Sequence, residues 1–229
     1  EKIREIQSRE KVPILVGGTG LYIRAVLYQF QFTEEVGDEA TRKKWEDYAE
    51  KYGNEQLHEQ LAQVDPKSAA SIHPNNIRRV VRALEIYEKT GQTKVEQEAN
   101  TGDEIVIPHL IFGMDRPREE LYERINERVI QMIEEGLEEE VRQLIADGFR
   151  NTQAMTGIGY KEWYPFLDGH LSKQAVIEAI QQNSRRYAKR QLTYFRHQLP
   201  VHWIDARRSI VDQVKEMEEI WIEKGKNDE

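Results

Sequence analysis

The fold is decided by the stretch Val12-Pro13-Ile14-Leu15-Val16-Gly17-Gly18-Thr19-Gly20-Leu21-Tyr22-Ile23-Arg24-Ala25-Val26-Leu27. It begins with a continuous apolar run, passes through four small residues and continues in the pattern of an amphipathic helix. This order predicts a strand over 12–16, a tight turn over 17–20 and a helix from Leu21. A continuously apolar strand is typical of a parallel sheet that is covered on both faces, so the expected fold class is α/β.

Charged amphipathic helices dominate the chain between about Thr33 and Asn100. Their expected ranges are 38–51, 56–64, a short helix opened by Asp65-Pro66, and 75–90 closed by Gly91 as its C′ residue. We therefore predict an all-helical insertion over 33–103. It interrupts an α/β core made of residues 1–32 and 104–229.

Strand character returns at residues 105–113, after the predicted insertion. Further helices are expected over 2–9, from 115 to a break at Gly136, from there to Gly148, and from about Ser172 to His197. The last of these must stop before Pro200, because the residue that precedes a proline disfavours helical geometry. The sequence thus predicts a protein that is rich in helices.

The composition excludes several kinds of site. The 229 residues include no cysteine, so disulfides, thiolate zinc sites and a cysteine nucleophile are excluded. No apolar run approaches the roughly 20 residues that a membrane span requires, and we expect a cytoplasmic protein with no membrane partner. The six histidines lack metal-ligand spacing, and no isolated pair of carboxylates stands out as acid and base.

The charges are unevenly distributed along the chain. The net charge is −8, which by itself argues weakly against a nucleic-acid partner. The window 179–204, however, has no Asp or Glu and carries +5, while the remainder carries −13. It contains two like-charged pairs four residues apart, Arg185 with Lys189 and Arg186 with Arg190. Such pairs mildly destabilise a helix unless an anion lies across them, so the last long helix indicates a polyanionic partner.

Aromatic residues interleave with the cations of this helix. Ile180, Tyr187 and Tyr194 have heptad spacing, which favours packing in the core over stacking on bases. The basic helix is therefore expected to have one apolar side.

Thr19 is a candidate ligand-binding residue in the glycine-rich stretch. It lies where a strand is expected to meet a helix, so its hydroxyl can hydrogen-bond a phosphate or a base. The alternative is that the stretch is a tight turn alone, because it matches neither a Gly-x-Gly-x-x-Gly nor a Walker sequence.

Two groups of arginines can bind phosphate. Arg78, Arg79 and Arg82 lie on one expected helix and can grip a phosphate backbone. Alternatively, Arg82 forms surface pairs with Glu85 or Glu88. Arg124 and Arg128, four residues apart, can meet a diphosphate or form a solvated ion-pair face with neighbouring glutamates, which are Glu120, Glu123 and Glu127.

These segments, in this order, resemble the bacterial tRNA dimethylallyltransferases, which are also called tRNA isopentenyltransferases. The resemblance covers essentially the whole chain. It rests on Val16-Gly17-Gly18-Thr19-Gly20-Leu21-Tyr22, on His73-Pro74-Asn75-Asn76 followed by Arg78-Arg79-x-x-Arg82-Ala83-Leu84-Glu85, on Leu121-Tyr122-x-Arg124-Ile125-x-x-Arg128, on Gly157-Ile158-Gly159-Tyr160, and on Ala188-Lys189-Arg190-Gln191-Leu192-Thr193-Tyr194-Phe195-Arg196.

The resemblance implies a P-loop-type parallel sheet core, partial in this chain, with a helical insertion that grips the anticodon stem. In that family the adenosine beside the anticodon is flipped out, and its N6 attacks C1 of dimethylallyl diphosphate and displaces pyrophosphate. A Walker-like loop holds the diphosphate with Mg²⁺, and an Asp after it is taken as the base. Because both would precede Glu1, we expect a truncated chain that holds no metal and transfers no prenyl group by itself.

The resemblance also implies roles for individual residues. Thr19 would lie at the flipped adenosine as the catalytic residue of this chain, and Arg42 would contact tRNA. Further tRNA contacts are implied for Arg78, Arg79, Val80, Val81 and Arg82, for Thr156, Gly157, Ile158, Gly159, Tyr160 and Lys161, and for Lys189, Arg190, Gln191, Leu192, Thr193, Tyr194, Phe195 and Arg196. Arg124 and Arg128 would lie near the diphosphate or the tRNA backbone.

The expected partners are therefore tRNA and dimethylallyl diphosphate, bound by a monomer. Two rival functions stay open at this point. One is a related enzyme that prenylates free adenine nucleotides, which would share the core chemistry but would not need the tRNA-gripping surfaces. The other is a non-catalytic RNA-binding fragment.

Overall fold

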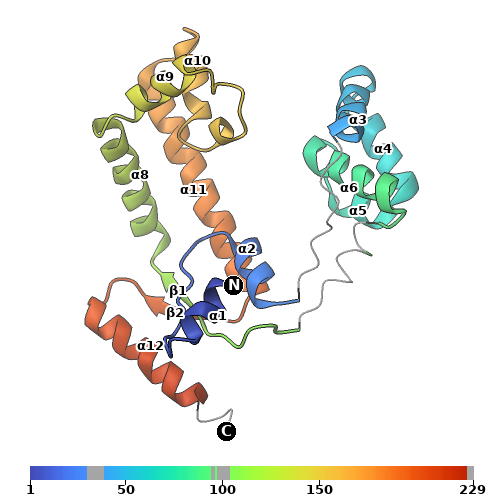
Figure 1. The fold of residues 1–229 in the computed structure, drawn as a ribbon. Coiled ribbons are helices and arrows are strands. Elements are labelled where there is room, and N and C mark those ends of the chain that lie inside the picture. The colour runs from blue at the N-terminus through green and yellow to red at the C-terminus, as the bar shows by residue number, and fades with distance from the viewer. Residues whose placement is uncertain (30–38, 94–95, 97–103, 226–229) are drawn as a thin grey trace. The chain divides into compact units, whose positions relative to one another are not determined.

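The computed structural model of the protein describes residues 1–29, 39–93, 96 and 104–225. The chain forms two compact units. Unit 1 consists of Glu1–Gly20 and His109–Glu229, and unit 2 consists of Leu21–Pro108. Helices make up most of both units (Figure 1).

Four of the described helices of unit 2 pack around one apolar core. They are α3 (Glu39–Tyr52), α4 (Asn54–Val64), α5 (Pro66–Ser71) and α6 (Ile77–Thr90). The core residues Leu57, Leu61 and Val80 are completely buried. Asp65 caps α5 by accepting a hydrogen bond from the Ser68 amide at 3.0 Å. Gly91 ends α6 with φ +67, a left-handed conformation that glycine adopts without steric cost. The helices expected from periodicity are thus present.

Two segments of the chain, one on each side of the four helices in sequence, meet near Tyr28. α2 (Gly20–Leu27) begins at the last residue of unit 1 and runs into unit 2. Beyond it, Tyr28 forms an isolated antiparallel bridge with Ile105, and the Leu27 carbonyl accepts hydrogen bonds from the amides of Val106 and Ile107. The predicted strand over 105–113 is therefore divided. Its first three residues contact Leu27 and Tyr28, and a regular strand begins only at Ile111.

The sheet of unit 1 has two parallel strands among the described residues. They are β1 (Ile111–Asp115) and β2 (Val201–Asp205), and their register pairs Ile111 with Val201 and Asp115 with Asp205. The parallel pair confirms the predicted α/β class. The sequence reading missed both β2 and the helix that follows it, α12 (Ile210–Gly225).

The described helices of unit 1 are α1 (Lys2–Gln7), α8 (Arg118–Glu134), α9 (Leu137–Ala146), the short α10 (Tyr164–Leu167), the 26-residue α11 (Lys173–Gln198) and α12, with short 3-10 turns at Ala154–Thr156 and Lys161–Trp163. Those from α8 to α11 enclose a second apolar core, to which α1 and α12 contribute no residue. Trp163, Val141 and Val176 are completely buried in this core. The expected break between α8 and α9 is present, at Gly136 with φ +100.

The strand predicted over 12–16 is not formed. The segment has no regular structure, and the exposed fractions of Val12, Ile14, Leu15 and Val16 are 54%, 83%, 55% and 88%. An apolar run becomes a buried strand only where other strands pair with it and helices cover it, and no described segment does either for residues 12–16. The apolar pattern therefore predicts burial, whereas these residues are exposed in the structure.

The expected apolar side of the basic helix is also only partly formed. Ile180 is 1% exposed and belongs to the core of unit 1, as predicted. Tyr187, by contrast, is 41% exposed, because the core ends before this turn of α11. The prediction for Tyr187 was therefore wrong.

Gly113 should control the pairing of the two strands. A Cβ atom there would lie 2.7 Å from Val201 Cγ1 and 2.8 Å from Trp203 Cζ3. We expect Gly113→Ala to lower the free energy of unfolding by about 1–3 kcal/mol, the usual cost of overpacking. Thermal unfolding followed by circular dichroism measures it. Gly17→Ala is the matched control, since nothing lies within 4 Å of a Cβ there. Equal losses in both variants would contradict the steric explanation.

Candidate functional site

A cleft opens at the carboxyl ends of the two parallel strands. Its volume is about 770 Å³, and it is lined by the ends of β1 and β2, the first residues of α8 and the last turns of α11. The carboxyl ends of parallel strands are where ligands commonly bind in α/β proteins. The cationic residues that line the cleft are Arg116, Arg118, Lys189, Arg196 and Arg207. Its lining thus joins residues that are far apart in the sequence.

Arg196 is held in the cleft by two interactions. Its Nη2 atom lies 2.8 Å from Asp115 Oδ1, and its guanidinium stacks at 5.2 Å from the centroid of the Trp203 ring. Arg196 was expected to contact tRNA. Its charge is already paired at the end of β1, so it acts in the cleft as an ordered group rather than as an open cation.

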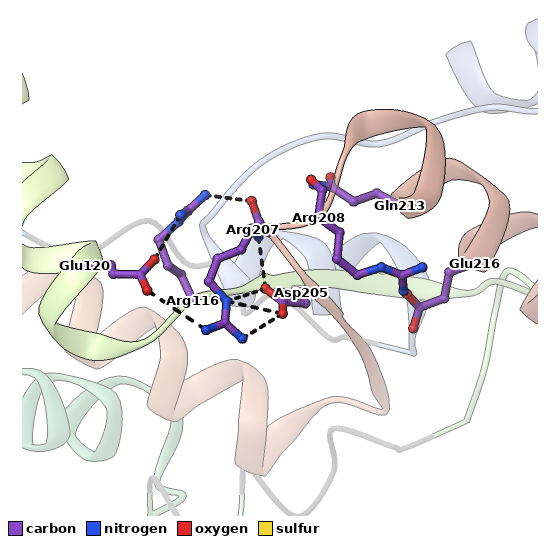
Figure 2. Close-up of polar contacts among 8 residues, drawn as sticks. Arg116, Glu120, Asp205, Arg207, Arg208, Gln213 and Glu216 are labelled. Atoms are coloured by element: carbon purple, nitrogen blue, oxygen red, sulfur yellow. Dashed lines mark hydrogen bonds and ion pairs between the residues drawn. The ribbon is translucent and has the colours of Figure 1, made fainter.

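Asp205, at the end of β2, is bound tightly by Arg207 (Figure 2). The side chain of Arg207 donates to both carboxylate oxygens, with Nη2 at 2.8 Å from Oδ2, and its backbone amide donates to Oδ1 at 2.9 Å. The side-chain hydrogen bonds first, and then the backbone one, lower the pKa of Asp205 from 3.8 to about 2. Asp205 therefore stays ionised at neutral pH and cannot act there as a general acid.

Arg116 links this end of the sheet to α8. Its Nη1 donates to Glu120 at 3.1 Å, and its Nη2 donates to the Ala206 carbonyl at 2.6 Å. Figure 2 shows Arg116 and Arg207 side by side, with Glu120 in the first turn of α8 facing both of them. By contrast, within the described ranges no carboxylate forms an ion pair with Arg118 or Lys189. These two are the open cations of the cleft.

The glycine-rich loop lies against the basic helix α11. Gln191 Nε2 donates to the Gly18 carbonyl at 2.6 Å. Gly20 is buried, and a Cβ on it would lie 2.2 Å from Cδ1 of the Tyr194 ring. Thr19, between these two contacts, is exposed. The structure thus brings together two motifs that the sequence reading had treated separately. Gln191 and Tyr194, expected to bind tRNA, face the protein's own loop.

The 156–161 loop is fixed by a buried carboxylate. Glu162 is 8% exposed; its Oε2 accepts from the Gly159 amide at 2.9 Å, and its Oε1 accepts from Asn183 on α11 at 2.7 Å. Gly159 has φ +97, which favours glycine. Thr156 and Lys161 are exposed on this loop. The sequence analysis missed Glu162. The signal that could have identified it is an acidic residue three positions after Gly159, the second glycine of the Gly157-Ile158-Gly159-Tyr160 motif.

A second buried carboxylate organises the arginines of unit 2. Glu85 is completely buried, and its Oε2 lies 2.8 Å from Arg82 Nη1, while its Oε1 lies 3.6 Å from Arg42 Nη2. The predicted alternative of an Arg82–Glu85 pair is therefore present, although the glutamate is in the core rather than on the surface. Through Glu85, α6 and α3 hold two half-exposed guanidinium groups side by side.

The other residues of the expected α6 contact divide into two groups. Arg78 and Arg79 are exposed. Val80 and Val81 are 0% and 2% exposed and pack in the core of unit 2. Their side chains cannot face a ligand, because the apolar stripe of an amphipathic helix points inward. The prediction that the side chains of the two valines contact tRNA was therefore wrong.

Arg124 and Arg128 line a separate hollow of about 650 Å³ with Ser184 of α11. Arg128 pairs with Glu135 at 3.3 Å, and not with Glu123 or Glu127. The structure thus places these arginines on the side of α8 that faces α11, outside the cleft at the strand ends. No group of three or more His, Asp or Glu side chains suited to a metal ion occurs among the described residues.

A comparison with models of protein families identifies the family of this chain. The family described as IPP transferase matches residues 1–198. The chain belongs to the IPP transferase family.

The tRNA dimethylallyltransferase of Geobacillus thermodenitrificans is 51% identical over 203 residues, which are 89% of this chain and 64% of that protein. The tRNA dimethylallyltransferase of Bacillus licheniformis is 47% identical over 218 residues, 95% of this chain and 69% of that protein. The chain thus spans about 64% of the length of the first of these relatives.

Solved IPP transferase structures share the fold. A full-length tRNA isopentenylpyrophosphate transferase from Bacillus halodurans superposes with a TM-score of 0.63 at 42% identity, over 97% of this chain and 70% of that one. A eukaryotic dimethylallyltransferase captured in crystals while acting on tRNA gives a TM-score of 0.66 at 28% identity, over 93% and 55%. Among the described helices, none is long and apolar enough to cross a membrane.

The Asp205 pair gives a test of the cleft geometry. We expect Arg207→Ala to raise the pKa of Asp205 from about 2 toward 3.8, because the side-chain hydrogen bonds are lost while the backbone one remains. Carbon-13 NMR titration of the carboxyl group measures this. Since the folded pKa is depressed, the pair stabilises the fold above pH 3.8, and that stabilisation is lost as the pH falls through about 2.

Arg208→Ala is the control for this titration. Arg208 is the next residue and also pairs with an acid, but its partner is Glu216 of α12 (Figure 2). The pKa of Asp205 should be the same in this variant as in the parent. A pKa that stays at about 2 in Arg207→Ala would show that another group depresses it.

Proposed function

We propose that this IPP transferase family member serves to transfer a dimethylallyl group from dimethylallyl diphosphate to N6 of the adenosine 3′-adjacent to the anticodon in tRNA. The observation that carries the proposal is the 51% identity with a tRNA dimethylallyltransferase over 89% of the chain. The local geometry supports it, since exposed cations and an exposed threonine lie on one helix and the loop that contacts it.

Thr19 is proposed to contact the flipped adenosine. Its side chain is exposed at the start of α2, with the loop anchored on either side of it. A hydroxyl can hydrogen-bond a base edge as donor and acceptor. The loop backbone at Gly18 and Gly20 approaches α11 closely, so Thr19 is presented at a defined distance from the basic helix.

The tRNA backbone is proposed to lie across the exposed part of α11. Lys189 and Arg190 are exposed, and Arg190 stacks at 5.7 Å from the centroid of the Tyr187 ring. Phosphate contacts would relieve the repulsion between like charges four residues apart and release bound counterions. Exposed Arg78 and Arg79 of unit 2, with Arg42 and Arg82 held by Glu85, offer a second set of phosphate contacts.

Mg²⁺ enters the proposal as the ion that accompanies the diphosphate. Such an ion prefers carboxylate oxygens and water and neutralises phosphate charge. The residues that the structure describes do not fit such a site, because they contain no cluster of three metal-ligating side chains. No step is assigned through the ion, and each role above belongs to a residue of this chain.

An acceptor assay tests the proposed function. The chain would be joined in one polypeptide to the part of the Geobacillus relative that it does not match, and given dimethylallyl diphosphate with either unmodified tRNA or adenosine monophosphate. We expect transfer to tRNA and none to the nucleotide. Preference for the nucleotide would favour the free-adenine rival. Tight tRNA binding without transfer to either acceptor would favour an RNA-binding role.

Replacing Lys189 and Arg190 together with alanine should weaken tRNA binding and flatten its salt dependence. Each lost phosphate contact should reduce the logarithmic salt slope by about 0.7 to 0.9. Titrations of unmodified tRNA at several salt concentrations measure this, with circular dichroism to check folding.

The matched control removes the same charge elsewhere, by Lys2→Ala with Lys215→Ala on α1 and α12. Those lysines pair with Glu5 and Glu219 on their own helices. If the binding curves of the double α11 variant overlay those of the parent, the proposed role of this helix in tRNA binding is wrong.

A further inference from the structure

Residues 12–19 form a long exposed segment with few ties to the rest of unit 1. Val12 and Ile14–Val16 are exposed, and the segment has no regular structure. Within the described parts of the chain, the hydrogen bond from Gln191 to the Gly18 carbonyl is the one side-chain hydrogen bond that this segment receives. Because the loop makes so few contacts with the rest of unit 1, those contacts determine its position.

Both contacts of the loop are made by one turn of α11. Gln191 and Tyr194 are three residues apart and therefore lie on the same side of a helix. Gln191 reaches the Gly18 carbonyl at 2.6 Å, and the Tyr194 ring covers Gly20. Thr19 is the single residue between the two contacts.

The close approach depends on glycine at these two positions. A Cβ on Gly20 would meet Tyr194 Cδ1 at 2.2 Å and Cε1 at 2.4 Å, and a Cβ on Gly18 would meet Gln191 Nε2 at 2.4 Å. At Gly17, one residue earlier, a Cβ would meet nothing within 4 Å. The absence of side chains at Gly18 and Gly20 therefore allows the backbone to lie directly on α11.

We infer that Gln191 and Tyr194 are positioning residues, which fix the glycine-rich loop and therefore Thr19 to the basic helix. The inference deepens the proposed function and rests on it for its consequence. Lys189 precedes the pair by two residues and Arg196 follows it by two, so the anchors lie between cations of the same helix. RNA phosphates bound along α11 would then lie at a fixed distance from the threonine that meets the base.

The absence of cysteine allows a direct test of this inference. Gly17→Cys and Gln174→Cys would carry a pair of spin labels on the otherwise unchanged 229-residue chain. Position 17 is open, and Gln174 is exposed in the first turn of α11. The helix alone separates Gln174 from Gln191 by about 25 Å, a range in which pulsed electron paramagnetic resonance measures distances. A docked loop should give one narrow distance peak.

In samples that contain no RNA, two substitutions should each replace the narrow peak with a broad distance distribution. Gln191→Glu keeps the shape of the side chain but removes the donor, and Tyr194→Ala removes the ring. Tyr194→Phe should restore the parent distribution, because the ring edge that covers Gly20 is retained. Thr193→Ala is the control on the same turn, since the Thr193 hydroxyl donates to the Lys189 carbonyl within the helix. It should leave the peak unchanged.

A double-mutant comparison tests the glycine contact. Gly20→Ala should broaden the distribution in the parent background and add nothing in the Tyr194→Ala background, since the clash needs the ring. Circular dichroism would show that each variant is folded. A narrow peak that persists in both Gln191→Glu and Tyr194→Ala would overturn the inference, and so would equal broadening in Thr193→Ala.

The readout separates the inference from the proposed function. The distances are measured without tRNA or a prenyl donor, so they test the anchoring even if the chain fails to bind tRNA. In the acceptor assay, Tyr194→Ala should reduce prenyl transfer while the tRNA dissociation constant stays near that of Tyr194→Phe. A loss of tRNA affinity in Tyr194→Ala with an unchanged distance peak would instead make Tyr194 a direct tRNA contact, and the positioning role would be wrong.

Discussion

Burial of the first half of α11 is the interaction on which the rest of unit 1 depends. Val176 and Ile180 pack in the same core as Trp163, and all three are at most 1% exposed. That anchorage lets the second half of the same 26-residue helix extend beyond the core with its cations exposed. A helix is rigid over this length, so the glycine-rich loop, the strand-end cleft and the exposed cations are all placed by one element.

Each unit uses a buried glutamate to hold groups that face outward. Glu162 ties the 156–161 loop to Asn183, and Glu85 holds Arg42 and Arg82. A buried carboxylate is costly unless it is paired or hydrogen-bonded, so each glutamate favours the conformations that keep its partners nearby. In both units the acid orders residues that the proposed function assigns to RNA.

Local pattern predicted the helices well, because amphipathic period and caps are properties of the helix itself, as at Asp65 and Gly91. Features that depend on distant partners were not predictable. The apolar run over 12–16 needs a strand beside it, and neither β1 nor β2 pairs with it. β2 is a five-residue strand whose partner lies 90 residues earlier. For the candidate site, motif resemblance nominated Thr19 and the basic helix, whose roles stay predictions. It could not show that Val80 and Val81 face inward, nor that Gln191 and Tyr194 contact the loop.

The bridge between Tyr28 and Ile105 has a consequence for how such proteins can diversify. The backbone bonds there join the two ends of the segment that holds the four helices, with the Gln29 amide donating to the Glu104 carbonyl at 2.8 Å. A segment whose ends meet can be lengthened, shortened or exchanged without altering the register of β1 and β2. The four helices can therefore change in sequence and length during evolution while the parallel strands stay as they are.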